Sequence, residues 1–246
     1  MDRTVTFFSQ GQAIAANLSL PSEGAPCVIM SHGLEGNKGS TKWQLLATRL
    51  CEAGIASLRF NYRGCGQGTE RSQGEFEETT LGGRIQDFKA ALDFVQGTEV
   101  DSSRLGVIGS SLGGVVAIAV WDERIKVMVL MATPHQFPAP TKNQLRHTQD
   151  TEYFDLPSGR RIRTRFLKEL WQQDIGHDVG RIKCPLLIIH GSADKDVPVE
   201  NARRLYEKAN EPKRLEVIPG GSHGFDDHIH LQQAASLAFG WLGRYL

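Results

Sequence analysis

Short, almost wholly apolar runs recur along most of the chain, and ten or more amphipathic residues separate many of them. The runs cover residues 27–30, 55–60, 105–108, 125–131 and 185–189. A strand that is apolar on both sides is buried on both faces, as in a parallel sheet that is covered by helices. The pattern therefore predicts a three-layer α/β fold around a mostly parallel sheet.

The segments between the apolar runs predict the helices. Amphipathic stretches favour helices at residues 41–53, 81–96, 112–121, 199–209 and 227–245, and residues 213–218 predict one more strand. At the start, residues 3–9 and 13–20 alternate apolar and polar positions around a Gln-Gly-Gln turn, which predicts an antiparallel hairpin. A chain of 246 residues fits one such domain, so we expect residues 1–246 to form a single unit.

Residues 134–180 break this rhythm, because they are rich in proline and arginine and carry no long apolar run. We interpret this segment as a lid or cap insertion; a loosely packed surface excursion is the alternative. Within it, residues 151–156 and 161–166 alternate at period two around Pro157, Ser158 and Gly159, which predicts a small hairpin.

Charge and hydropathy exclude several classes of partner. Lys+Arg and Asp+Glu each number 28, so no bulk charge attracts nucleic acid or an anionic membrane. The longest apolar run, residues 115–121, is far shorter than the ~20 residues of a membrane span. Residues 1–8 show no secretory signal, and the four cysteines fit no CxxC or Cys/His zinc spacing. Three of them lie in apolar runs, as core residues of a protein from a reducing compartment would. A cytoplasmic protein is expected.

A candidate nucleophile lies between an apolar run and a predicted helix. The sequence Gly109-Ser110-Ser111-Leu112-Gly113 has the strand, tight turn and helix context of a nucleophile elbow, with Ser111 at its centre. Ser110 is the competing residue, because it also precedes the helix and could cap it.

A serine nucleophile needs a histidine to accept its proton. His223 is the best candidate, since it lies in a glycine-rich turn after residues 213–218, at the expected carboxyl end of a strand. Structural or solvent-exposed roles are expected for five other histidines, namely His32, His135, His147, His177 and His190.

The histidine in turn needs an acid to orient it, and one loop offers two. Asp194 and Asp196 lie between the run 185–189 and the helix that is expected from residue 199. Asp194 is preferred, because Asp196 lies where a capping carboxylate belongs. The chain order Ser111, Asp194, His223 is that of the α/β-hydrolase triad.

Two backbone N–H groups are expected to form an oxyanion hole. One belongs to Leu112, directly after the nucleophile at the start of a helix. The other is assigned to Leu34, in the glycine-containing loop after residues 27–30, although an ordinary glycine-rich turn would look the same.

Five motifs in this order resemble the α/β-hydrolase superfamily, closest to carboxylesterases of the cinnamoyl/feruloyl esterase and serine-aminopeptidase-like branch. They are residues 32–39 (HGLEGNKG), 60–66 (FNYRGCG), 109–113 (GSSLG), 190–198 (HGSADKDVP) and 221–225 (GSHGF). The resemblance implies eight strands, a lid between the sixth and seventh, and cleavage of carboxylic esters. Cys65 departs from the pattern, since relatives often carry His or Ser there.

Other sites are less favoured. No dinucleotide or P-loop motif is present, so no cofactor is expected. Residues 226–230 (DDHIH) could ligate a metal, but an acidic start of the last helix explains them better. An exposed hairpin face similarly explains Arg160, Arg161, Arg163 and Arg165 better than an anionic substrate does. The expected partner is a small ester, and a homodimer stays open. A peptidase, a thioesterase and a non-catalytic binding protein remain alternatives.

Overall fold

An eight-stranded sheet forms the centre of the computed structural model, which describes residues 2–137, 145–147 and 152–246. The strands are β1 (Asp2–Ser9), β2 (Gln12–Ser19), β3 (Pro26–Ser31), β4 (Ala56–Phe60), β5 (Asp101–Ser110), β6 (Ile125–Met131), β10 (Leu186–Gly191) and β11 (Lys213–Ile218). Their spatial order is β1-β2-β4-β3-β5-β6-β10-β11. The pairs β1/β2 and β2/β4 are antiparallel and all the other pairs are parallel, which confirms the predicted sheet with its N-terminal hairpin.

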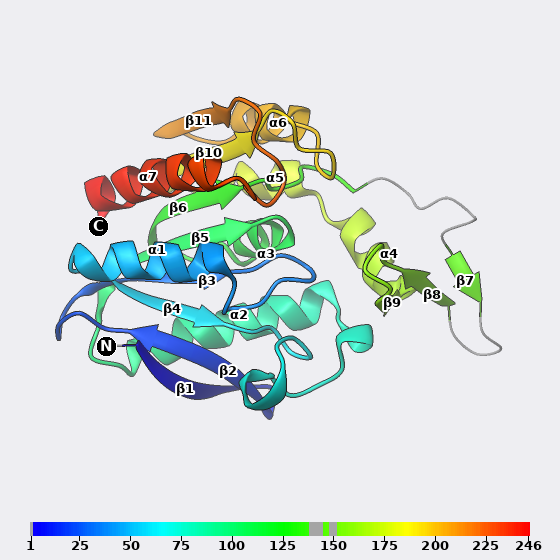
Figure 1. The fold of residues 1–246 in the computed structure, drawn as a ribbon, viewed down its shortest axis with the longest axis horizontal. Helices are drawn as coiled ribbons and strands as arrows, with labels where there is room; N and C mark the ends of the chain where they lie inside the picture. The colour runs from blue at the N-terminus through cyan, green and yellow to red at the C-terminus, as the bar shows by residue number, and fades with distance from the viewer. Residues whose placement is uncertain (1, 138–144, 148–151) are drawn as a thin grey trace.

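Helices cover both faces of this sheet (Figure 1). On one face lie α1 (Thr41–Glu52) and α7 (His228–Tyr245). On the other lie α2 (Leu81–Gln96), α3 (Leu112–Val120), α5 (Ile175–Val179) and α6 (Glu200–Lys208). Five of these six were expected from the amphipathic stretches, and they begin and end within one residue of the predicted bounds.

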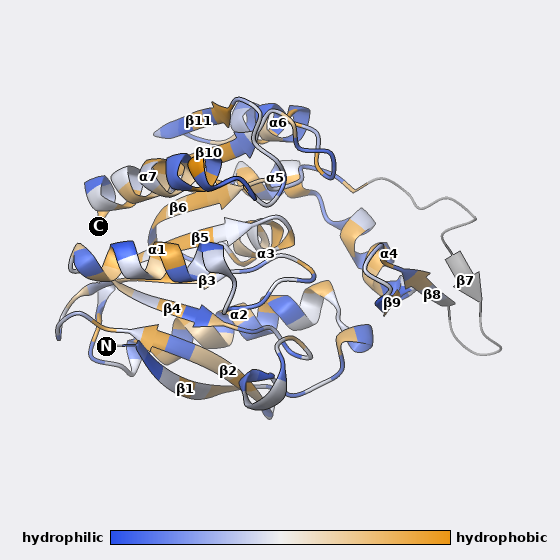
Figure 2. Cartoon of the chain, in the orientation of Figure 1, coloured by the Kyte–Doolittle hydropathy of each residue, from blue (hydrophilic) through white to orange (hydrophobic). Residues whose placement is uncertain are grey.

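The alternation of side chains along β3 explains why its sequence is apolar throughout. Cys27 and Ile29 point into the core beneath α2 and α3, whereas Val28 and Met30 point into the core beneath α1 and α7. All four are buried. Figure 2 shows the hydrophobic colouring concentrated on the central strands and on the inner sides of the helices. Burial on both faces holds the strand ends, and the loops after them, in a fixed place.

The insertion lies between β6 and β10, the sixth and seventh strands of the main sheet, as the resemblance implies. It contains a separate three-stranded sheet of β7 (Leu145–His147), β8 (Glu152–Asp155) and β9 (Arg161–Arg163), followed by α4 (Thr164–Gln172) and then α5. The antiparallel pair β8/β9 is the predicted hairpin. Thr151 and residues 138–144 and 148–150 lie outside the described residues.

The prediction of a strand over residues 161–166 is wrong in its second half. The strand ends at Arg163, and Thr164 begins α4. Phe166 and Leu170, four residues apart, are buried on one side of this helix. Residues 164–166 continue the period-two alternation of the strand, but they also begin the helical spacing of Phe166 and Leu170. These residues form a helix because it lets both apolar side chains pack on the same side.

Because β3, β5, β10 and β11 are parallel, their carboxyl ends meet at one edge of the sheet. The loops after these four strands carry four of the five motifs, and the motif at residues 60–66 follows β4, which is parallel to β3. In the part of the chain that the structure describes, no helix is both long and apolar enough to cross a membrane.

Candidate active site

Ser111 occupies a strained turn between β5 and α3. Its backbone has φ 54° and ψ −126°, a conformation that residues other than glycine rarely adopt. Close packing forces this turn: a Cβ atom on Gly113 would lie 2.1 Å from the carbonyl oxygen of Ser31. The elbow therefore requires glycine at position 113.

Ser110 does not cap the helix, so that alternative interpretation is wrong. The N-cap position of α3 is Ser111, and its side chain makes no capping hydrogen bond. The Ser110 hydroxyl is instead buried and accepts a hydrogen bond of 2.8 Å from the Lys42 ammonium. Burial lowers the pKa of Lys42 to about 8, against the opposing effect of Asp226.

Three side chains from three loops form a continuous hydrogen-bonded chain. His223 Nε2 lies 3.0 Å from Ser111 Oγ, and His223 Nδ1 lies 2.8 Å from Asp194 Oδ2. Because a carboxylate only accepts, Nδ1 carries the proton and Nε2 is free to accept from the serine hydroxyl. The Asp194 side chain is fully buried, whereas the His223 side chain is 25% exposed.

Asp194 is held by N–H donors on both of its oxygens. Its Oδ1 accepts from the backbone N–H groups of Asp196 and Val197 at 2.9 and 2.8 Å. Its Oδ2 faces His223 and also lies 3.2 Å from His190 Nε2. Burial alone would raise the pKa of Asp194, but the hydrogen bonds from His190, His223 and the Val197 amide hold it below its usual range. Asp194 is therefore a charged and immobile acceptor.

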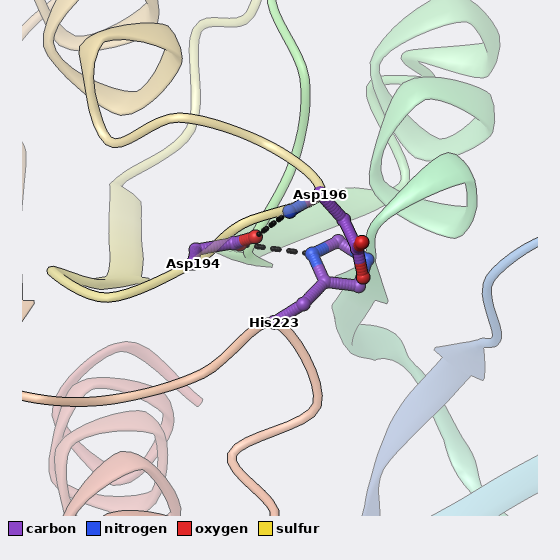
Figure 3. Close-up of side chains that lie close together, drawn as sticks. All are labelled: Asp194, Asp196 and His223. Atoms are coloured by element: carbon purple, nitrogen blue, oxygen red, sulfur yellow. Dashed lines mark hydrogen bonds and ion pairs between the residues drawn. The ribbon is translucent and has the colours of Figure 1, made fainter.

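Asp196 is exposed and does not cap α6, whose N-cap residue is Val199; the capping interpretation is wrong. Figure 3 shows Asp194 and Asp196 approaching His223 from the same loop. One ligand atom from each of these three side chains lies within 4.8 Å of the others, which is close enough to hold a cation. A cation would have to compete with the N–H groups that already bind Asp194, so the arrangement fits a metal poorly.

The loop after β3 lies directly against Ser111. A Cβ atom on Gly33 would lie 3.2 Å from the Cβ atom of Ser111, so the Gly33–Leu34 peptide borders the serine. Within the described residues, no acceptor is found for the Leu34 N–H. The Leu112 N–H is in the first turn of α3, where helices leave such groups without an intrahelical partner.

The remaining predicted candidates lie elsewhere. His177 is exposed on α5, and His135 lies half-buried at the start of the insertion, with its backbone N–H donating to Asn201 Oδ1. The side chain of His147 lies outside the described residues. Asp227 caps α7 by accepting from the N–H groups of Ile229 and His230, as the interpretation of residues 226–230 expected.

The arginines of the insertion fasten it to the η2 turn (Phe76–Glu78). Arg161 pairs with Glu77, and both Arg163 and Arg165 pair with Glu78. The Arg160 guanidinium stacks over the Phe76 ring at 3.3 Å from its centre. Because Arg161, Arg163 and Arg165 are paired with glutamates at the surface, these contacts agree with the interpretation as an exposed hairpin face and do not favour an anionic substrate.

Two contacts of the site were missed by the sequence analysis. His190 contacts Asp194, and its position four residues before Asp194 is the signal that could have indicated it. The Tyr62 hydroxyl lies 2.6 Å from the Ser31 hydroxyl, which donates to the Gly113 carbonyl and so ties the elbow to the β3 loop. No spacing in the sequence indicates this second contact, because 31 and 82 residues separate its partners.

Comparison with known proteins gives the family. The prolyl oligopeptidase family matches residues 40–246, which hold Ser111, Asp194 and His223. The chain belongs to the prolyl oligopeptidase family. A relative, the uncharacterized protein YfhR of Escherichia coli O157:H7, is 30% identical over an alignment of 220 residues, which covers 87% of this chain and 68% of that protein. A relative from Mycobacterium tuberculosis is 27% identical, and the match covers 63% of its length. The chain thus spans about two thirds of these relatives.

Solved structures confirm the α/β-hydrolase architecture for this prolyl oligopeptidase family chain. The esterase domain of a Rhodothermus marinus protein has a TM-score of 0.78 and 27% identity, and the match covers 100% of this chain and 99% of that one. Est1E of Butyrivibrio proteoclasticus, solved with ferulic acid bound, has a TM-score of 0.81 at 20% identity, and the match covers 97% and 99%. At that identity Est1E supports the fold alone. Fold and relatives together make the chain a hydrolase with esterase-like neighbours.

Proposed function

We propose that this chain is a serine hydrolase that cleaves carboxylic esters through an acyl-enzyme on Ser111. The observation that carries the proposal is the hydrogen-bonded chain from Ser111 through His223 to the buried carboxylate of Asp194. A hydroxyl is a poor nucleophile unless a base accepts its proton during attack. The hydrogen bonds to Ser111 and Asp194 hold His223 in the orientation that such a base needs.

The proposed reaction has two steps. Ser111 Oγ attacks the ester carbonyl while its proton passes to His223 Nε2, and Asp194 stabilises the positive charge on the imidazole. The N–H groups of Leu34 and Leu112 donate to the oxyanion. The protonated Nε2 then gives its proton to the departing alkoxide, and water releases the acid by the same route in reverse. No step needs a cofactor.

A peptidase or amidase is the second candidate, because the match to the prolyl oligopeptidase family favours it. An amide differs in its leaving group, since the amine must be protonated by His223 as it departs. A thioester would use the same residues. Turnover of matched ester, thioester and aminoacyl-anilide substrates with one acyl group separates the three.

Residues 134–180 are proposed as a lid on a single hydrolase domain, in which they would help to choose the substrate. The described contact between Ser158, at the turn of the hairpin, and Glu35, next to Leu34, supports this role. A cytoplasmic location is also part of the proposal, and the four free cysteines of the chain agree with it.

Hydrolysis of p-nitrophenyl esters by the wild type, Ser111→Ala and Ser110→Ala tests the proposal. We expect Ser111→Ala to lose turnover by at least about 10⁴-fold, as triad serines do, while Ser110→Ala, the matched neighbour, keeps measurable turnover. A Ser111→Ala protein that is folded and still fully active would contradict the mechanism. A wild type that is folded but inactive on every ester, thioester and anilide would favour the non-catalytic alternative.

A further inference from the structure

A fully buried arginine lies behind the candidate oxyanion loop. Arg84, on α2, has no exposed side-chain surface. Its guanidinium donates to the Leu34 carbonyl at 2.9 Å and approaches the Gly33 carbonyl at 3.4 Å, and its Nε donates to Thr79 Oγ1 at 3.0 Å. The guanidinium also stacks over the Tyr62 ring, 4.8 Å from its centre. One side chain thus holds two consecutive carbonyl groups of the loop.

A neutral histidine holds the same loop from another side. His32 Nε2 accepts from the Tyr62 N–H at 3.2 Å, so the proton must be on Nδ1, which donates to the Gly33 carbonyl at 2.7 Å. Burial, followed by the charge of Arg84, lowers the pKa of His32 to about 3, which keeps the ring neutral. The Gly33 carbonyl therefore has side-chain donors from His32 and Arg84, besides the backbone N–H of Gly36 at 3.2 Å.

These donors act on the peptide that carries the proposed oxyanion donor. The Gly33 carbonyl and the Leu34 N–H belong to one peptide unit, and in a planar trans peptide the two groups point in opposite directions. Fixing the carbonyl toward His32 and Arg84 therefore fixes the N–H toward the opposite side. Gly33 lies against Ser111, so this orientation sets where the Leu34 N–H meets a substrate oxygen.

The charge of Arg84 is not explained by an ion pair. Within the described residues no carboxylate lies within 4.0 Å of the Arg84 guanidinium. By contrast, Arg63, in the loop after β4, pairs with the buried Asp87. Burying a guanidinium without a carboxylate is costly, and the cost falls when its N–H groups bind backbone carbonyls. The carbonyls that receive these N–H groups are those of the oxyanion loop.

We propose that Arg84 is a positioning residue for the oxyanion hole: it clamps the Gly33 and Leu34 carbonyls from behind and thereby aims the Leu34 N–H at the substrate oxygen. The inference rests on the proposed function and adds a residue that never touches the substrate. Loss of these hydrogen bonds from Arg84 should weaken transition-state binding. It should leave the hydrogen bonds that join Ser111, His223 and Asp194 intact.

The test compares Arg84→Met, which removes the donors, with Arg84→Lys, which keeps a charge but not the two-pronged geometry. Arg63→Met is the matched control, because it also removes an arginine from this part of the molecule and leaves the buried Asp87 carboxylate without its ion-pair partner. For Arg84→Met we expect kcat on a p-nitrophenyl ester to fall about tenfold to hundredfold with little change in KM, a partial loss relative to deleting an oxyanion donor. The kcat of Arg84→Lys should lie between that of Arg84→Met and that of the wild type.

Two further readouts separate positioning from a general loss of stability. Inhibition by a trifluoromethyl ketone, whose adduct on serine carries an oxyanion, should weaken by the same factor as kcat, with an unchanged shape of the pH–rate profile. Hydrogen exchange of the peptide covering residues 32–40 should become faster in Arg84→Met than in the wild type. Arg63→Met should lower the melting temperature while kcat and the exchange of residues 32–40 stay near the wild-type values.

The outcomes are distinct. Folded Arg84→Met or Arg84→Lys protein with wild-type kcat, inhibitor affinity and exchange at residues 32–40 would overturn the inference. An inactive wild type would instead overturn the proposed function. In that case faster exchange of residues 32–40 in either Arg84 variant still supports the clamp, and unchanged exchange refutes it. If Arg84→Met fails to fold, Arg84→Lys alone decides by the same measurements.

Discussion

The candidate active site and the insertion are both rich in polar contacts, but the contacts differ in burial. At the site, the Asp194 side chain is fully buried, and its two oxygens accept from the N–H groups of Asp196 and Val197 and from His223 Nδ1. In the insertion, the Arg161–Glu77 pair has side chains that are 50% and 41% exposed. Hydrogen bonds away from water hold a geometry firmly, whereas exposed ion pairs contribute little and are screened by salt.

This contrast separates a fixed part of the molecule from an adjustable one. Ser111 and Asp194 follow β5 and β10, whose last residues are buried, and His223 follows the edge strand β11, whose last residue, Ile218, is buried. The three-stranded sheet of the insertion is fastened to the η2 turn by ion pairs at the surface. Chemistry that needs sub-ångström placement is expected on the first part, and adaptation to different substrates on the second.

The largest effect is expected from the acid of the fixed part. Asp194→Asn should lower kcat about 10⁴-fold, because an amide can impose the wrong tautomer on the histidine. Asp196→Asn, the exposed neighbour on the same loop, should change kcat little. Steady-state kinetics of the two purified variants checks this, and equal losses in both would end the distinction between the two aspartates.

The next effect concerns the packing of the elbow. Gly113→Ala should destabilise the protein by more than about 2 kcal/mol, because its Cβ atom would overlap the Ser31 carbonyl. Gly240→Ala is the matched control in the exposed interior of α7, where a Cβ meets nothing within 4 Å, and should stabilise by about 0.5–1 kcal/mol. Urea unfolding measures both. Tolerance of alanine at position 113 would show that the turn is not fixed by this contact.

A smaller effect is expected in the pH dependence of stability. The folded pKa of Asp194 lies below its unfolded value of about 3.9, so its stabilising contribution is complete above that value and is lost as the pH falls toward the folded pKa. The difference in unfolding free energy between the wild type and Asp194→Asn should therefore be smaller at pH 3 than at pH 6. A difference independent of pH would mean that the hydrogen bonds do not favour the charged form.

The smallest effect is expected in the insertion. Glu78→Gln removes the carboxylate shared by Arg163 and Arg165, and the melting temperature should hardly change because these groups are exposed. Limited proteolysis within residues 134–180 should become faster, and high salt should make the wild type behave like the variant. A large fall in melting temperature would show that the insertion is part of the rigid core.

The sequence predicts the sheet and the main helices well, because burial on both faces leaves a continuous apolar run and each helix keeps its own period. It also names Ser111, Asp194 and His223, since each follows a strand whose carboxyl end must lie at the same edge. The contacts of Arg84 with Gly33 and Leu34 have no sequence signal. They join residues about 50 positions apart and arise only when α2 packs against the sheet. Helix α4 was missed because its first turn continues an alternating strand pattern.

The most direct test of the central claim is to locate the covalent bond that the site forms. The protein is treated with a fluorophosphonate, digested and analysed by fragmentation mass spectrometry of the peptide that contains Ser110 and Ser111. The mechanism predicts a phosphonyl adduct on Ser111 that is absent from Ser111→Ala and from denatured protein. An adduct on Ser110, or no adduct on folded protein that is active on esters, would contradict it.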